Sequence, residues 1–418
     1  MARDGDDARE PAAHAVVIPC HDEPDWEATL ASLAACEAPD RPFDVLLVVN
    51  GAADDPPEVR ARDQATADEA HRWARSRRTD RVRFEVVDAL DLPPRHAGVG
   101  LARRIGMDLA ATRLEENGNP RGALVCLDAD TTVAPNYMRA IEAHFAAHPR
   151  TPGCAIHFEH PLPDDPRARA GIVGYELHLR VYVHGLRWAG HPDAYQTVGS
   201  AMAVRADVYR RQGGMNRRKA GEDFYFLQKV IPLGGFTELR ATTVYPSPRV
   251  SHRVPFGTGR AMGAWIAGAD DEPTTYDPRV YEELRALIFR LGNLDGAPRA
   301  LLAQAPESLR PFLASQGFES AIREIQANAA TPQSRRRRFF HWMNAFRVLK
   351  LVHDATAARY PRVPVSQAAA TVAQARGFGE MSPVNAEGCL ARFRAVDQGE
   401  IAPAACQPSH GAGSVGVF

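Results

Sequence analysis

The chain has 418 residues, 45% of them hydrophobic and 24% charged, so it is long and apolar enough to bury a substantial core. Its 50 basic and 51 acidic residues nearly cancel, which excludes a global field that would recruit nucleic acid or an anionic membrane. The start, MARDGDDARE, lacks an apolar signal segment, and the six cysteines show no C-x-x-C spacing. We therefore expect a cytoplasmic protein with reduced thiols.

Strand and helix patterns alternate through the first half of the chain. Short apolar runs predict strands, and amphipathic stretches predict helices. The expected strands are 15–19, 45–49, 82–87 and a fourth that begins at 124, and the expected helices are 24–35, 57–78 and 98–114. This order predicts an α/β fold with a mainly parallel sheet flanked by helices, and ligands at the carboxyl ends of its strands.

A polar cluster follows each expected strand at once: CHDE, NG, RHAG and DAD in chain order. In the last cluster Asp128 and Asp130 are one residue apart, so in an extended segment both side chains point the same way. Two carboxylates held together usually need a cation between them, and Mg²⁺ or Mn²⁺ would supply it. The alternative is a solvated turn that caps the helix expected to begin near Pro135.

The order of these motifs resembles that of family-2 glycosyltransferases, which have the GT-A, nucleotide-diphospho-sugar transferase fold. The resemblance covers roughly residues 14–255. The motifs that carry it are PCHDE (19–23), VVNG (48–51), GVGLAR (98–103), DAD (128–130), GSAMAVR (199–205) with Gly213-Gly214, and GED (221–223). The resemblance implies a hexosyltransferase-type enzyme with a nucleotide-sugar donor of the UDP or GDP type. It also implies a divalent metal on the diphosphate, and transfer to an acceptor hydroxyl with inversion.

The resemblance also implies roles for single residues. Asp130 would bind the metal, Asp128 would contact the ribose or share the metal, and His252 would be a late metal ligand or else an ordinary surface histidine. Asp223, beside Glu222, would be the catalytic base, although acids at a helix start also favour the helix dipole. The other positions implied in nucleotide-sugar binding are Pro19, His21, Glu23, Asn50, Arg103 and Gly199.

Four residues, in three of the motifs, depart from the family pattern. His21-Asp22 stands where the family commonly has Tyr-Asn. Asn50 stands where it commonly has Asp, and because Asn can present a donor or an acceptor, the base of the nucleotide stays open. Arg103 replaces a usual Asn, and it could reach the diphosphate or be an exposed helix charge.

The signals change beyond residue 260, where helical patterns follow one another. In 333–355 apolar residues recur at three- to four-residue steps beside four arginines at 335–338. We interpret this stretch as a core helix. The alternative is a membrane-surface helix, in which residues 335–352 would make weak peripheral contact with the inner face of the membrane. We expect a disordered N-terminus (1–13), a transferase domain (14–262), a helical C-terminal extension (263–365) and a loosely ordered tail (366–418).

Other functions and the acceptor stay open. LDADTT also fits the pattern of haloacid-dehalogenase-like phosphatases, with Asp128 as nucleophile and Asp130 as acid/base. A catalytically inactive nucleotide-binding scaffold is a further alternative. The acceptor is unknown, but by resemblance residues 160–200 recognise it, and the aromatic and histidine side chains there are Tyr175, His178, Tyr182, Trp188, His191 and Tyr195.

Overall fold

The computed structural model describes residues 10–77, 79–251, 257–268 and 272–402. These residues divide into two compact units. The first unit contains the described residues of 1–176 and 195–271 together with Phe340–Leu349, and the second contains those of Leu177–Ala194, Glu272–Phe339 and 350–418. The domain boundary expected at residue 262 therefore falls inside a helix, α8 (Thr258–Ala267).

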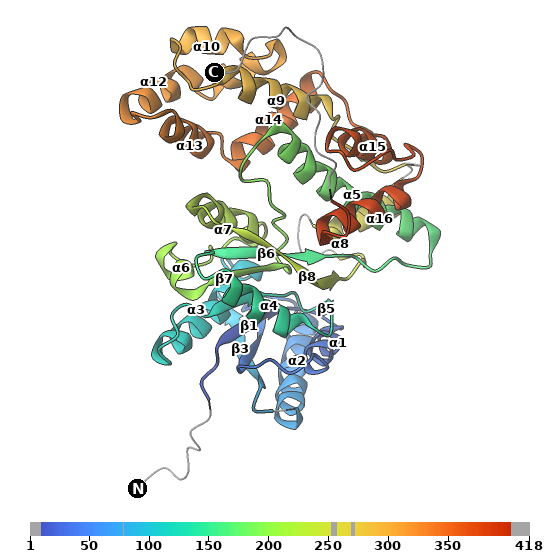
Figure 1. The fold of residues 1–418 in the computed structure, drawn as a ribbon. Helices are drawn as coiled ribbons and strands as arrows, with labels where there is room; N and C mark the ends of the chain where they lie inside the picture. The colour runs from blue at the N-terminus through green and yellow to red at the C-terminus, as the bar shows by residue number, and fades with distance from the viewer. Residues whose placement is uncertain (1–9, 78, 252–256, 269–271, 403–418) are drawn as a thin grey trace. The chain divides into compact units, whose positions relative to one another are not determined.

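An eight-stranded sheet forms the centre of the first unit in the part of the chain that the structure describes (Figure 1). The strand order is β3-β2-β1-β4-β7-β6-β8-β5. Strands β1 to β4 run parallel, as do β6 and β8, whereas β7 is antiparallel to both its neighbours and β5 is antiparallel to β8. The strands are β1 (His14–Cys20), β2 (Phe43–Ala52), β3 (Val82–Leu92), β4 (Ala123–Cys126), β5 (Thr131–Val133), β6 (Gly153–Phe158), β7 (Met202–Arg205) and β8 (Thr237–Pro246).

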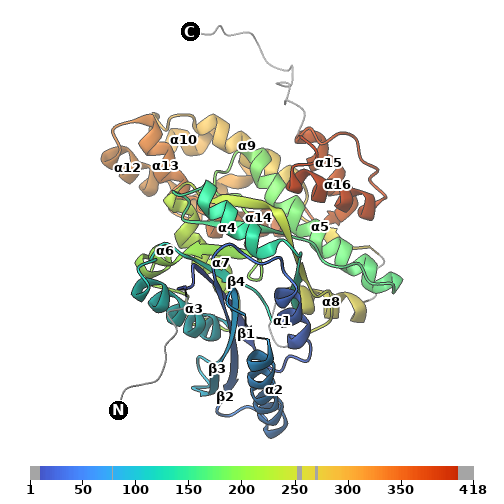
Figure 2. The ribbon, with the colours of Figure 1, turned by 60° about the horizontal axis from the view of Figure 1, so that its bottom comes forward.

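Helices cover both faces of the parallel part of this sheet (Figure 2). On one face α3 approaches so closely that a Cβ on its Gly106 would collide with the side chains of Val17 and Val48. On the other face Trp73 of α2 packs edge-on against Phe84 of β3, with ring centroids 4.9 Å apart. The expectation of an α/β fold with a mainly parallel, helix-flanked sheet is confirmed. The helices are α1 (Trp26–Ala34), α2 (Pro57–Ser76), α3 (Val99–Glu116), α4 (Tyr137–Ala147), α5 (Pro166–Ala189), α6 (Ala206–Arg211), α7 (Glu222–Val230) and α8.

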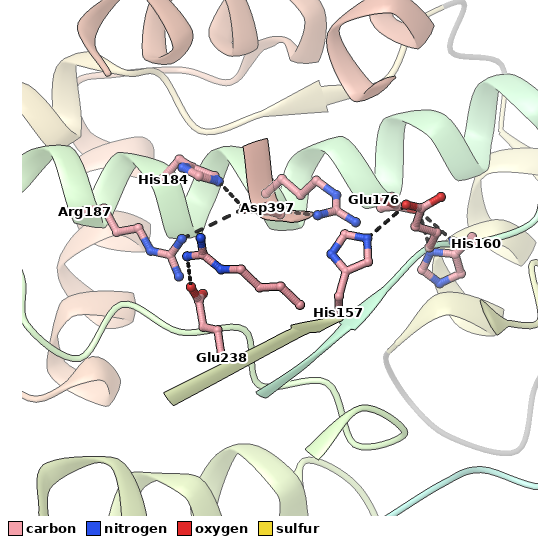
Figure 3. Close-up of polar contacts among 10 residues, drawn as sticks. His157, His160, Glu176, His184, Arg187, Glu238 and Asp397 are labelled. Carbon is pink, nitrogen blue, oxygen red and sulfur yellow. Dashed lines mark hydrogen bonds and ion pairs between the residues drawn. The ribbon is translucent and has the colours of Figure 1, made fainter. Parts of the chain in front are cut away.

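The second unit is helical apart from the short pair β9 (Thr274–Thr275) and β10 (Val363–Pro364). Asp397 on α16 accepts hydrogen bonds from Arg180 and His184 of α5, and so ties the two helices together (Figure 3). Although burial raises it, the pKa of Asp397 is lowered well below its usual range by His184 and Arg180. The remaining helices are α9 (Arg279–Leu291), α10 (Pro298–Gln304), α11 (Arg310–Ser315), α12 (Phe318–Asn328), α13 (Pro332–Trp342), α14 (Ala345–Ala358), α15 (Val365–Ala375) and α16 (Ala386–Gln398). The end of α13 and the start of α14 belong to the first unit.

Two parts of the C-terminal region differ from expectation. The stretch 333–355 is not one helix, because α13 ends at Trp342 and α14 begins at Ala345. The tail expected to be loosely ordered from residue 366 onward contains nearly all of α15 and the whole of α16, whose apolar residues such as Val372 and Leu390 are buried. Alanine, which made this region look featureless, is the strongest helix former. Residues 403–418 lie outside the described residues.

No helix in the described ranges is both long enough and apolar enough to cross a membrane. Apolar positions along this stretch are buried: Phe339 on α13, Met343 between the two helices and Val352 on α14. Arg336, Arg337 and Arg338 are exposed. The interpretation of this stretch as core is thus confirmed for these apolar positions. Contact of 335–352 with a membrane stays a prediction.

Candidate functional site

Several chain segments meet at one edge of the sheet in the first unit. Because β1, β2 and β4 run parallel, the residues at and beyond their carboxyl ends share that edge. Strand β7 runs antiparallel to β4, with Met202 opposite Cys126, so the residues just before β7 reach the same edge. The topology therefore brings together segments that are up to about 180 residues apart in the sequence. Pro19 lies within β1, opposite Val48, and is buried.

Arg103 on α3 forms the centre of this edge. It is 2% exposed, and its guanidinium group donates to Asp128 Oδ1 and to Glu222 Oε1. A buried guanidinium needs such partners because removing an unpaired charge from water is costly. The expectation that Arg103 could be an exposed charge on the helix is therefore wrong. It joins α3, the end of β4 and the start of α7 through ion pairs.

Asp128 and Asp130 do not lie in an extended segment, which corrects the premise of the sequence argument. Thr131 donates its backbone N–H to the carbonyl of Asp128 at 3.1 Å, so the chain turns between β4 and β5. Neither carboxylate caps the following helix, because α4 begins at Tyr137 with Asn136 at its N-cap. Because of this turn, the two carboxylates have different partners. Asp128 pairs with Arg103, and Asp130 pairs with Arg249.

Glu222 and Asp223 begin α7. The residue before them, Gly221, has φ +69°, a left-handed conformation that favours glycine, and this sharp entry sets the direction of the first turn. Glu222 is buried and forms an ion pair with Arg103. Burial raises the pKa of Glu222 to about 7, although the positive charge of Arg103 lowers it. Asp223 is half-buried, and burial raises its pKa also. Its Oδ1 accepts a hydrogen bond from the N–H of Phe224 at 2.7 Å.

Gly199, in the segment before β7, lies directly against these groups. A Cβ at this position would lie 2.5 and 2.8 Å from the two terminal nitrogens of Arg103 and 2.8 Å from Asp223 Oδ2. A larger residue here would force the Arg103 or Asp223 side chain to shift, so glycine permits the close approach rather than an unusual backbone angle. Arg103 and Asp223 therefore both lie on the side of Gly199 where a Cβ would project.

Asp130 and Glu23 share a second arginine. Arg249, in the chain beyond β8, pairs with Glu23 Oε2 and lies 3.5 Å from Asp130 Oδ2. Glu23 is 4% exposed and Asp130 about a quarter exposed. Sequence analysis did not find Arg249, because no motif marks it and it is distant from both carboxylates along the chain.

His21 and Asn50 belong to a third group, at the ends of β1 and β2. His21 Nδ1 lies 2.9 Å from both Asp63 Oδ2 and the carbonyl oxygen of Asn50, and the hydrogen bond to Asp63 raises the pKa of His21. Asn50 is 3% exposed, and its Oδ1 is buried without a hydrogen-bond partner among the described residues. Asp63 was missed, yet a signal existed: it is an acid on the buried face of α2, in line with Ala67, Ala70 and Ala74.

The segment expected to recognise the acceptor divides between the two units. In the first unit, the fully buried Glu176 accepts hydrogen bonds from the backbone N–H of His160 at 2.8 Å and from its Nδ1 at 3.1 Å (Figure 3). Burial raises the pKa of the neighbouring Tyr175, and the negative charge of Asp223 adds to this rise. The residues at 177–194 belong to the second unit.

The carboxylates fit the divalent cation that the resemblance implies. Asp128 and Asp130 offer the hard oxygen ligands that Mg²⁺ and Mn²⁺ prefer, and their side chains are 39% and 23% exposed, so an ion can reach them. His252, the third expected ligand, lies outside the described residues. Elsewhere in the described residues, ligand atoms of His21, Asp55 and Asp63 lie within 4.8 Å of one another. Both carboxylates already have hydrogen-bond partners, since Asp63 pairs with His21 and Asp55 accepts from the N–H of Ala52.

Comparisons with known proteins find similarity at a low level. No protein-family model and no curated protein matches the chain. Among solved structures, it is similar to S. aureus TarS. The crystal structure of TarS 1–349 in complex with UDP-GlcNAc is 12% identical with a TM-score of 0.39, over 79% of this chain and 91% of that one. The complex with UDP is 11% identical with a TM-score of 0.38, over 84% and 93%. These scores are too low to support an argument about activity.

Proposed function

We propose that the chain is a metal-dependent glycosyltransferase that moves a sugar from a nucleoside-diphospho-sugar to an acceptor hydroxyl. The observation that carries this proposal is the grouping of carboxylates at the strand ends. Asp128, Glu222 and Asp223 lie around Arg103 and Gly199, and Asp130 lies in the turn that follows Asp128, beside Arg249. They outnumber the guanidinium groups of Arg103 and Arg249 that pair with them. Such a group attracts a divalent cation, and the cation in turn makes the site suitable for a diphosphate.

Asp128 and Asp130 would hold the cation. When bound, the cation neutralises the negative charge that builds on the leaving diphosphate. Arg103 fixes the position of Asp128 through their hydrogen bond. Because the guanidinium group of Arg103 also donates to Glu222, it has few N–H groups left to bind a phosphate. We therefore assign Arg103 to positioning and leave diphosphate contact to the cation. His21, Glu23 and Asn50 would line the nucleotide side, where the buried Oδ1 of Asn50 calls for a donor on the ligand.

Asp223 would be the catalytic base. Glu222 is committed to Arg103, whereas the hydrogen bond that Asp223 accepts within the described residues comes from the backbone of Phe224. The acceptor oxygen forms a bond to the anomeric carbon, the proton of its hydroxyl moves to the Asp223 carboxylate, and the bond from that carbon to the diphosphate oxygen breaks with its electron pair on the leaving group. Attack from the face opposite the leaving group inverts the anomeric carbon. Tyr175, near Asp223, would lie on the acceptor side.

Calorimetry with UDP and with GDP, each with and without Mn²⁺, tests this function. The wild type should bind one of the two nucleotides in a Mn²⁺-dependent way. Asp130→Asn should lose that binding and keep the unfolding temperature of the wild type, because its side chain keeps the same shape. Metal-independent binding that Asp130→Asn leaves unchanged would contradict the proposal. Release of phosphate from a simple phosphomonoester, with no affinity for either nucleotide, would support the phosphatase alternative.

A further inference from the structure

Arg249 occupies the position next to Asp130 where a cation would be expected. Its Nη2 pairs with Glu23 Oε2 and lies 3.5 Å from Asp130 Oδ2, and its Nη1 lies 3.2 Å from Asp25 Oδ2. One guanidinium group thus serves three carboxylates. The shared nitrogen is the link between the expected metal ligand and the loop after β1.

The topology of the sheet makes this arrangement specific. β5 pairs with β8 in antiparallel register, with Thr131 opposite Pro246, so Asp130 lies beside the chain that leaves β8. Glu23 is fixed on the other side, because its Oε1 accepts from the N–H of Asp25 at 2.9 Å. Arg249 enters between them from its own strand end and is about a quarter exposed.

The three contacts are unequal. Glu23 is almost fully buried, so it needs a counter-ion and holds Arg249 firmly. Asp130 is partly exposed and is the most distant of the three carboxylates, so its contact is the easiest to give up. Arg249 can therefore release Asp130 and still keep Glu23 and Asp25.

We propose that Arg249 is an internal cation that competes with the divalent metal for Asp130. The inference rests on the proposed function, because it assumes that Asp130 is a metal ligand. A metal ion without nucleotide has to displace Arg249 and then lies beside its positive charge, so it binds weakly. A diphosphate that arrives with the metal offsets both positive charges, since guanidinium groups pair well with phosphate oxygens. Arg249 thus makes the binding of metal and of nucleotide interdependent, and this coupling is reciprocal.

The binding of Mn²⁺ alone, followed by electron paramagnetic resonance of the free ion, tests the proposal on the full chain. Arg249→Met should bind Mn²⁺ about three- to tenfold more tightly than the wild type, because the competitor is gone. Arg240→Met is the matched control: it removes one positive charge from β8, where Arg240 pairs with Glu238, and it should stay within about twofold of the wild type. Asp130→Asn should lose the site. Adding UDP or GDP should tighten Mn²⁺ binding less in Arg249→Met than in the wild type.

The outcomes separate this inference from the function on which it rests. If Arg249→Met binds Mn²⁺ no more tightly than the wild type while Asp130→Asn abolishes binding, the metal site stands and the competition is refuted. If none of the variants binds Mn²⁺ with or without nucleotide, the metal site and the competition both fail. Arg249→Met leaves Glu23 buried without its counter-ion, so the double variant Glu23→Gln/Arg249→Met provides the same comparison in a protein without that unpaired charge.

Discussion

Arg103 on α3 forms an ion pair with Asp128, just beyond β4, in which the arginine side chain is buried and the Asp128 side chain is 39% exposed. The pair links a helix that covers the sheet to the strand that delivers the candidate metal ligands. The same guanidinium group reaches Glu222, so the first carboxylate of α7 is held in the same network. The position of Asp128 is therefore set from inside the protein, whatever ligand binds outside.

Replacing Arg103 should destabilise the protein strongly. Arg103→Met keeps an apolar stem but leaves Asp128 and Glu222 without their counter-ion, and the loss of one partner of a buried pair costs about 3–5 kcal/mol. Arg113→Met is a control on the same helix, because Arg113 forms an exposed pair with Glu85 that is worth about 0–1 kcal/mol. Urea unfolding of the two variants measures the difference. Equal costs would show that the buried network does not hold the strand end.

Stability should also depend on pH through His21. Its hydrogen bond with Asp63 raises its pKa in the folded protein above the ordinary value near 6.5. The folded state then binds the proton more tightly, so this contribution is fully present below the ordinary pKa and is lost as pH rises through the folded pKa. His21→Gln should therefore cost more unfolding free energy at pH 6 than at pH 9, by about 1 kcal/mol or less for a partly exposed pair. A cost that is the same at both pH values would contradict this assignment.

The sequence allowed the sheet and its carboxyl edge to be predicted because both depend on local patterns. The buried run of β1 and the apolar run before Asp128 are strand signals, and the polar residues directly beyond them have to lie at the strand ends. The pairing of β5 with β8 depends on contacts about 110 residues apart, so nothing local announces that Arg249 meets Asp130. The turn at Asp128 was one of two alternatives for a related reason: the boundaries of an element are the least reliable part of a sequence-based assignment.

The apolar side of α13 and α14 should be important for stability, and the neighbouring arginines should not. Met343 is fully buried, so Met343→Ala should cost about 2–5 kcal/mol. Replacing the exposed Arg337 and Arg338 with Gln should change stability by about 0.5 kcal/mol or less. Thermal unfolding tests both variants. Binding to anionic liposomes can be measured for the same variants. If the wild type binds and the double arginine variant does not, the prediction of weak membrane contact through 335–352 is supported.

The most direct test of the proposed reaction is the transfer rate of Asp223→Asn, compared with its donor affinity. The change keeps the shape of the side chain at the start of α7 and removes its basicity. Once calorimetry has identified the nucleotide, sugars carried on it can be screened for transfer. We predict that donor binding and unfolding temperature stay close to those of the wild type, that turnover falls by about 10²- to 10⁴-fold, and that the product of the wild type has inverted anomeric configuration by NMR. Turnover within a few-fold of the wild type, or a product that retains the donor's configuration, would contradict the role of Asp223 and the mechanism built on it.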